Sequence, residues 1–195
     1  MIYYLVGYMG CGKSTIAKEI GNKYNVKVID TDAEIERMLG LSIKEAFDKY
    51  GEDYFRTVET QVLKQITENN DNCVVSCGGG LPCFNDNMTY INAHGISVYI
   101  KVSLEEIISR LSKLEIEKRP ILIDKDINSF IPNQLKEREY FYNKSKYIYD
   151  ENFNLTNEFQ KWLAENYQNV YKSYITDRDN FEIDYLHVDD MTLIP

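Results

Sequence analysis

The stretch Gly7-Tyr8-Met9-Gly10-Cys11-Gly12-Lys13-Ser14 decides the fold of this chain. It matches the pattern G-x-x-x-x-G-K-[ST], it follows the apolar run Ile2–Val6, and a helical pattern begins at Lys13. A strand, a glycine-rich loop and a helix in that order form the context in which this pattern binds nucleotide phosphates. Glycines let backbone N–H groups turn toward phosphate oxygens, and the helix N-terminus adds positive potential. We therefore predict a nucleotide phosphate site at this loop.

The residue types in the loop suit ATP bound with Mg²⁺. We expect Lys13 to reach the β- and γ-phosphates and the Ser14 hydroxyl to bind the Mg²⁺ ion. Thr15 adds a hydroxyl near the α-phosphate. The predicted nucleotide-binding residues of the loop are Gly10, Cys11, Gly12, Lys13, Ser14 and Thr15.

Apolar strand patterns and helical patterns alternate along the rest of the chain. This alternation predicts an α/β fold in three layers, with a central parallel sheet and helices on both faces. The expected strands cover residues 2–6, 27–29, 73–77, 96–102 and 146–149, and the expected helices cover 13–24, 33–39, 42–50, 52–69, 85–93, 103–113, 128–143 and 156–173.

Three candidate ligand-binding strings follow directly after expected strands. The glycine loop follows Val6, Asp30-Thr31-Asp32 follows Ile29, and Gly78-Gly79-Gly80 follows Cys77. Ligands of parallel α/β sheets bind beyond the carboxyl ends of the strands. The three strings are therefore expected to meet at one edge of the sheet.

Composition narrows the partners and the compartment. The net charge of −9 argues against a large nucleic-acid footprint, which needs a basic face. No run approaches the roughly 20 apolar residues of a membrane span, and the N-terminus lacks the basic start of a signal peptide. Cys73 and Cys77 are too far apart along a strand to share one zinc ion, so reduced thiols are expected. We expect a cytoplasmic, monomeric protein that binds neither nucleic acid nor membrane.

A phosphate loop alone does not separate kinases from switch GTPases or motor ATPases. A GTPase needs an N-K-x-D guanine motif, and the nearest string, Asn143-Lys144-Ser145-Lys146, lacks the aspartate. The 195 residues leave little room for the coupling modules of a motor. A small-molecule kinase is the remaining class.

From the first strand to about residue 150, the chain resembles the shikimate kinase family. The resemblance rests on six strings in the same order: the phosphate loop, Asp30-Thr31-Asp32, Phe55-Arg56-Thr57-Val58-Glu59, Gly78-Gly79-Gly80, Arg119-Pro120-Ile121-Leu122, and Arg138 followed by Tyr142. It implies the P-loop fold of the nucleoside monophosphate kinases and transfer of the γ-phosphoryl group of ATP to the 3-hydroxyl of shikimate.

The resemblance also implies roles for single residues. Asp32 binds the substrate hydroxyl and can accept its proton. Asp30 lies on the Mg²⁺ side, although an aspartate here can equally cap a helix that starts at Ala33. Arg56 and Arg138 clamp the substrate carboxylate, and Glu59 orients Arg56. Gly78, Gly79 and Gly80 contact the substrate hydroxyls. Phe47 and Phe55 fall where the family packs apolar groups against the ring, although phenylalanines on helices can equally be core residues.

Two further arginines complete the expected site. Arg119 lies in a predicted mobile lid at about residues 114–126, where it meets the transferring phosphoryl group. By resemblance Arg110 stacks on adenine, but an arginine near a helix C-terminus can also simply interact with the helix dipole. The expected kinase domain covers residues 1–175, with a substrate-binding segment at about 33–65. Residues 176–195 form an extension without an assigned role. Residues 150–157, where the family usually offers further adenine contacts, contain no arginine, so the sequence does not assign the rest of the base pocket.

Two alternatives remain open at the level of sequence. One is a kinase for another small hydroxy acid, such as gluconate, or for a nucleoside monophosphate. The other is a non-catalytic nucleotide-binding sensor, which the presence of Lys13, Ser14, Asp32 and Arg119 argues against.

Overall fold

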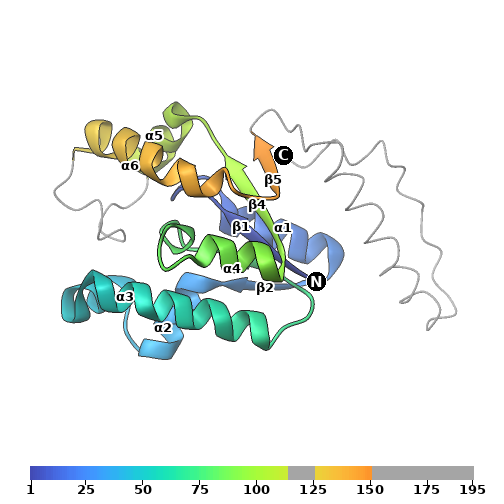
Figure 1. The fold of residues 1–195 in the computed structure, drawn as a ribbon. Coiled ribbons are helices and arrows are strands. Elements are labelled where there is room, and N and C mark those ends of the chain that lie inside the picture. The colour runs from blue at the N-terminus through green and yellow to red at the C-terminus, as the bar shows by residue number, and fades with distance from the viewer. Residues whose placement is uncertain (114–125, 151–195) are drawn as a thin grey trace, which may run out of the picture. The chain divides into compact units, whose positions relative to one another are not determined.

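The computed structural model describes residues 1–113 and 126–150. Strands and helices alternate, as predicted (Figure 1). In chain order the elements are β1 (Ile2–Val6), α1 (Lys13–Tyr24), β2 (Lys27–Asp30), α2 (Thr31–Leu39), α3 (Ile43–Glu68), β3 (Cys73–Ser76), the 3₁₀ turn η1 (Leu81–Cys83), α4 (Asn87–His94), β4 (Ile96–Lys101), α5 (Leu104–Lys113), α6 (Ile127–Tyr142) and β5 (Tyr147–Asp150).

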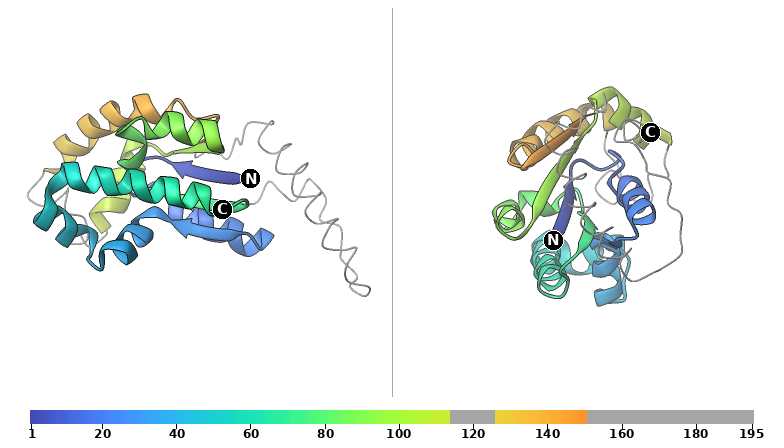
Figure 2. Two further views of the ribbon diagram at one scale, coloured as in Figure 1. Left: turned by 60° about the horizontal axis from the view of Figure 1, so that its bottom comes forward. Right: turned by 90° about the vertical axis from the view of Figure 1, so that its right-hand side faces the viewer.

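The strands form one sheet in the order β2-β3-β1-β4-β5. β1 pairs in parallel with β3 on one side and β4 on the other, and β2 pairs in parallel with β3. Helix α1 lies on one face of the sheet, and α3 and α4 lie on the other (Figure 2). The predicted α/β fold class is confirmed.

The central strand explains why the first residues are so apolar. All five residues of β1 are buried, because strands flank it on both sides and helices cover both faces. Tyr4 carries a polar group into this apolar surrounding, and its hydroxyl forms a 2.7 Å hydrogen bond with the hydroxyl of Thr67 on α3. This bond satisfies a polar group that burial would otherwise penalise.

Helix α2 departs in detail from the prediction, whereas α3 agrees with it. The carboxylate of Asp30 caps α2, so that helix begins at Thr31 rather than at residue 33. We expected separate helices on the two sides of Gly51, and the structure confirms this break. Gly51 has non-helical backbone angles, with φ 79° and ψ 173°, so α3 consists of two helical stretches that meet at a kink there. Helix α2 ends at Leu39, as predicted, with Gly40 at φ 64° as its C-cap.

The chain divides into a compact unit, Met1–Ile148, and a second unit that begins at Tyr149. Arg119, most of the expected lid, the expected helix 156–173 and the extension 176–195 lie outside the described residues. The predicted domain limits therefore stay predictions. In the described parts of the chain, no helix combines the length and the apolar character that crossing a membrane needs.

Candidate active site

The phosphate loop connects the carboxyl end of β1 to the first turn of α1. Gly10 and Gly12 have φ values of 80° and 98°, which side chains disfavour and which let the loop curl over the helix end. The first intrahelical bond runs from the Ile16 N–H to the Gly12 carbonyl at 3.0 Å. The loop therefore presents the N-terminal amides of α1 at the edge of the sheet, as predicted.

Lys13 folds back across the loop that carries it. Its ammonium group donates 2.8 Å hydrogen bonds to the carbonyls of Gly7 and Tyr8, and its Nζ lies 3.6 Å from the sulfur of Cys11. The side chain is buried. Within residues 1–113 and 126–150 the ammonium group is bonded to neutral groups and forms no ion pair, so these residues hold the positive charge in place without cancelling it.

Three oxygen-bearing side chains meet beside the start of α1. The Ser14 hydroxyl donates to one carboxylate oxygen of Asp30 at 2.9 Å and lies 3.0 Å from the hydroxyl of Ser76. The other oxygen of Asp30 accepts from the Asp32 N–H at 3.0 Å. Asp30 therefore caps α2 and contacts Ser14 at the same time, so the two roles weighed for it are compatible. Ser76 was missed by the sequence analysis, since nothing marks a serine at the end of a strand.

The glycine run after β3 makes room for charged side chains of the protein itself. A Cβ atom added to Gly78 would lie 2.5 Å from Oδ1 of Asp32 and 3.3 Å from Oε1 of Glu59. A Cβ atom on Gly80 would lie 2.4 Å from NH1 of Arg56. The Gly78 N–H donates to the Thr31 hydroxyl at 2.8 Å, which ties the run to α2.

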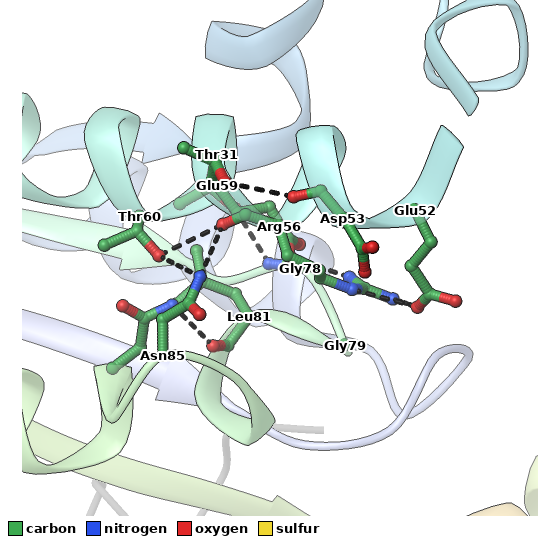
Figure 3. Close-up of polar contacts among 12 residues, drawn as sticks. Thr31, Glu52, Asp53, Arg56, Glu59, Thr60, Gly78, Gly79, Leu81 and Asn85 are labelled. Atoms are coloured by element: carbon green, nitrogen blue, oxygen red, sulfur yellow. Dashed lines mark hydrogen bonds and ion pairs between the residues drawn. The ribbon is translucent and has the colours of Figure 1, made fainter. Parts of the chain in front are cut away.

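Arg56 is a buried cation between two glutamates, not a surface ion pair (Figure 3). Its NH1 donates to Glu59 at 2.7 Å, and its Nε and NH2 donate to one oxygen of Glu52 at 3.1 and 2.7 Å. Glu59 sits three residues later on α3, as the predicted brace requires. Glu52 was not predicted, although its position four residues before Arg56 could have suggested it.

Aromatic rings surround the same guanidinium group. Its Cζ lies 4.2 Å from the ring centroid of Phe84, 5.5 Å from that of Phe55 and 5.7 Å from that of Phe47. Phe47 and Phe55 also contact each other, with centroids 4.3 Å apart. The two phenylalanines thus line the surroundings of Arg56, and Phe55 is also part of the core.

The pKa of Glu59 is shifted by burial and by the charged groups around it. Burial raises the pKa of Glu59 to about 7, Arg56 and Arg138 act to lower it, and Asp32 acts to raise it. The charges of Asp32, Arg56 and Arg138 therefore all act on the carboxyl group of Glu59. These three residues come from α2, α3 and α6, so the fold assembles the residues that the sequence predicted for the acceptor.

Helix α6 connects this cluster to the phosphate loop. Arg138 is buried. A Cβ atom added to Gly79 would lie 3.7 Å from NH1 of Arg138 and 3.3 Å from the backbone nitrogen of Met9 in the phosphate loop. The Tyr142 hydroxyl donates to the Gly79 carbonyl at 2.6 Å. The Tyr8 hydroxyl donates to Gln134 of the same helix at 2.8 Å. The nucleotide loop and the charged cluster therefore lie side by side.

Arg110 of α5 also reaches the phosphate loop. Its Nε donates to Glu106 at 2.7 Å, and its NH1 donates to the Gly10 carbonyl at 3.4 Å. The guanidinium group thus lies at the loop, where the predicted contact with a nucleotide base is possible. The expected role in adenine binding stays a prediction.

The four cysteines are free thiols, and Cys11, Cys73 and Cys77 are buried. Burial raises the pKa of Cys83 to about 11 and raises the pKa of Cys73 and Cys77 as well. These groups are protonated near neutral pH and are poor nucleophiles.

Comparison with known proteins gives a consistent result. The family model for shikimate kinase matches residues 9–171. A shikimate kinase of Azobacteroides pseudotrichonymphae genomovar. CFP2 is 40% identical over 149 residues, which are 75% of this chain and 87% of the relative.

Solved structures agree with this match. The shikimate kinase of Bacteroides thetaiotaomicron has a TM-score of 0.71 at 32% identity, covering 89% of this chain and 98% of that one. The shikimate kinase of Acinetobacter baumannii, solved in complex with shikimate, has a TM-score of 0.73 at 28% identity and covers 92% and 95% of the two chains. The family match and the order of the motifs agree, and this chain belongs to the shikimate kinase family.

Proposed function

We propose that this chain transfers the γ-phosphoryl group of ATP to the 3-hydroxyl of shikimate, giving ADP and 3-phosphoshikimate. One observation carries the proposal for the site: Arg56 is buried and bonded to Glu59, and the glycine run after β3 packs against Glu59, Asp32 and Arg138 beside the phosphate loop. A hydroxy acid fits this arrangement because its carboxylate needs cationic donors and its hydroxyl needs a nearby acceptor.

The acceptor half of the site would work by positioning. Arg56 and Arg138 bind the carboxylate, with Glu59 holding Arg56, and the glycines 78–80 let the ring approach the backbone. Asp32 orients the reacting hydroxyl and can accept its proton as the oxygen attacks phosphorus. Direct in-line transfer needs no covalent intermediate, since placement and charge neutralisation supply most of the rate enhancement.

The nucleotide half would stabilise charge. Lys13 exchanges its carbonyl partners for phosphate oxygens, and the backbone of residues 10–15 surrounds the remaining phosphate oxygens. Arg110 contacts the base, and Arg119 meets the transferring group. The cytoplasmic location and the monomeric state of the protein stay predictions.

The residues present fit a Mg²⁺ ion bound with the nucleotide. Ser14 and Asp30 are oxygen donors in hydrogen-bond contact with each other, and Mg²⁺ prefers oxygen ligands shared with substrate phosphates. Ser14 would hold the ion directly and Asp30 through a water molecule. When bound, Mg²⁺ neutralises charge on the β- and γ-phosphates.

An ADP-release assay over several acceptors tests the proposal. The purified chain is supplied with ATP, Mg²⁺ and, in turn, shikimate, gluconate and AMP. We expect the highest kcat/KM with shikimate. A higher kcat/KM with gluconate or AMP would overturn the choice of acceptor, and tight ATP binding without turnover of any acceptor would indicate a sensor.

A further inference from the structure

The search beyond the assigned roles leads to Glu52, a carboxylate on the buried acceptor arginine. Glu52 and Arg56 form an i, i+4 pair on α3 in the favourable order, with the acid on the N-terminal side. The side chain of Glu52 is 52% exposed, whereas that of Arg56 is 8% exposed. Figure 3 shows the arginine side chain extending along the helix toward Glu52. The glutamate therefore meets the guanidinium group from the solvent side.

The bonds to the glutamates determine which donors of Arg56 are left for a ligand. A guanidinium group has five N–H donors. Nε and NH2 donate to the same oxygen of Glu52, and NH1 donates to Glu59. The described part of the chain leaves two N–H groups for a ligand, one on NH1 and one on NH2. These two nitrogens form the terminal edge of the group, which can bind a carboxylate through both oxygens.

The terminal edge of the guanidinium group lies beside a glycine. A Cβ atom on Gly80 would be 3.0 Å from Cζ, 2.4 Å from NH1 and 3.1 Å from NH2, which places it in front of the NH1/NH2 edge. The absence of a side chain at Gly80 therefore leaves room at that edge. The ring of Phe84 has its centroid 4.2 Å from Cζ. Since Glu52 holds the Nε edge and Gly80 leaves room at the terminal edge, the described residues leave the terminal edge as the approach for an anion.

We propose that Glu52 is a positioning residue for the acceptor carboxylate: it fixes the Nε edge of Arg56, so that the terminal NH1/NH2 edge is turned toward the acid. The inference rests on the proposed function. Without Glu52, the guanidinium group would keep the single bond to Glu59 and could rotate its Nε edge toward the ligand. Binding the acid would then also require fixing the arginine, which weakens affinity for the acid in particular.

Position and charge can be separated by two conservative variants. Glu52→Gln keeps an amide oxygen at the same reach and removes the negative charge. Glu52→Asp keeps the charge and shortens the side chain, so it no longer spans the distance to Arg56. Positioning predicts that the Gln variant behaves nearly like the wild type and that the Asp variant behaves like Glu52→Ala.

The experiment measures steady-state kinetics with shikimate and with its methyl ester, which has the same hydroxyl groups and no carboxylate. For Glu52→Ala and Glu52→Asp, we expect the KM for shikimate to rise about tenfold, while kcat, the KM for ATP and the KM for the ester stay within about twofold. Asp53→Ala, which removes the neighbouring exposed carboxylate of the same helix, is the matched control and should leave every parameter unchanged. Thermal unfolding of each variant accompanies the kinetics.

Two results would overturn the role of Glu52. An equal loss with the acid and the ester would indicate a general structural effect. A lower KM for shikimate in Glu52→Ala would show that Glu52 occupies the place of the substrate carboxylate and competes with it. Both results presuppose normal turnover of shikimate by the wild-type chain. Absence of that turnover would instead overturn the proposed function, and this inference with it.

Discussion

The two halves of the site hold their buried cations in different ways. The ammonium group of Lys13 is held by two neutral carbonyls of its own loop, whereas the guanidinium group of Arg56 is held by two carboxylates of its own helix. Neutral partners leave the charge of Lys13 for the phosphates. Carboxylate partners compensate the charge of Arg56 and fix its direction. Among the described residues, the nucleotide half therefore supplies an uncompensated positive charge, and the acceptor half mainly supplies an oriented guanidinium group.

This difference separates the expected kinetic effects. A group that supplies charge to the transition state should affect kcat, because the phosphoryl group is most in need of stabilisation there. A group that supplies direction to a spectator carboxylate should affect mainly the KM of the acceptor. Each of the following changes tests one side of that comparison.

The largest effect is expected for Lys13→Ala. Loss of its charge should lower kcat by about a hundredfold to a thousandfold, with little change in the KM for shikimate. Initial rates at saturating ATP measure this, and Lys18→Ala, an exposed lysine of the same helix, is the control. A variant with normal kcat and only a raised KM for ATP would place Lys13 in ground-state binding instead.

The next effect is expected for Arg138→Ala on the acceptor side. Removal of one buried donor to the carboxylate should raise the KM for shikimate by about thirtyfold or more, with a smaller change in kcat. Kinetics at fixed ATP and varied shikimate measure this. Lys136→Ala removes an exposed charge from the same helix and should have no effect. A wild-type KM for shikimate in the Arg138 variant would show that Arg138 does not bind the carboxylate.

A smaller effect, on stability, is expected from Glu59. Burial raises its pKa to about 7 in the folded protein, so between the ordinary glutamate pKa and about 7 the folded state binds more protons than the unfolded state. Glu59 therefore makes the free energy of unfolding fall as pH rises through this window. Glu59→Gln lacks this contribution, so its stability relative to the wild type should increase from pH 5 to pH 7. Urea unfolding at several pH values measures the difference, and parallel pH profiles would contradict the shift.

The smallest effect is expected for Ser76→Ala on the nucleotide side. The hydroxyl of Ser76 contacts that of Ser14, the proposed Mg²⁺ ligand. Loss of this contact should raise the Mg²⁺ concentration that gives half-maximal rate by about fivefold. Titration of Mg²⁺ at fixed ATP measures this. An unchanged Mg²⁺ dependence would show that Ser76 has no part in orienting Ser14.

The sequence predicted the nucleotide half more completely than the acceptor half. The phosphate loop is continuous in the chain, so local chemistry specifies Lys13, Ser14 and the glycines. The position of Asp32 after a strand marked it as a candidate, but its role and those of Arg56, Glu59 and Arg138 came from the family resemblance, because these residues lie on three separate helices. Their mutual contacts depend on how those helices pack, which periodicity does not specify.

The features that the sequence analysis did not predict also have physical causes. Glu52 and Ser76 act through neighbours, and their importance appears only once Arg56 and Ser14 are placed in space. The early start of α2 follows from the local cap by Asp30, whose carboxylate accepts from the N–H groups of Asp32 and Ala33.

The most direct test of the central claim is a crystal structure of this chain with ADP, Mg²⁺ and shikimate. The account predicts that the shikimate carboxylate contacts Arg56 through NH1 and NH2 and also contacts Arg138, that a ring hydroxyl lies beside Asp32, and that the phosphates lie against Lys13. A shikimate molecule whose carboxylate is held elsewhere, with Arg56 still enclosed by its glutamates, would contradict it.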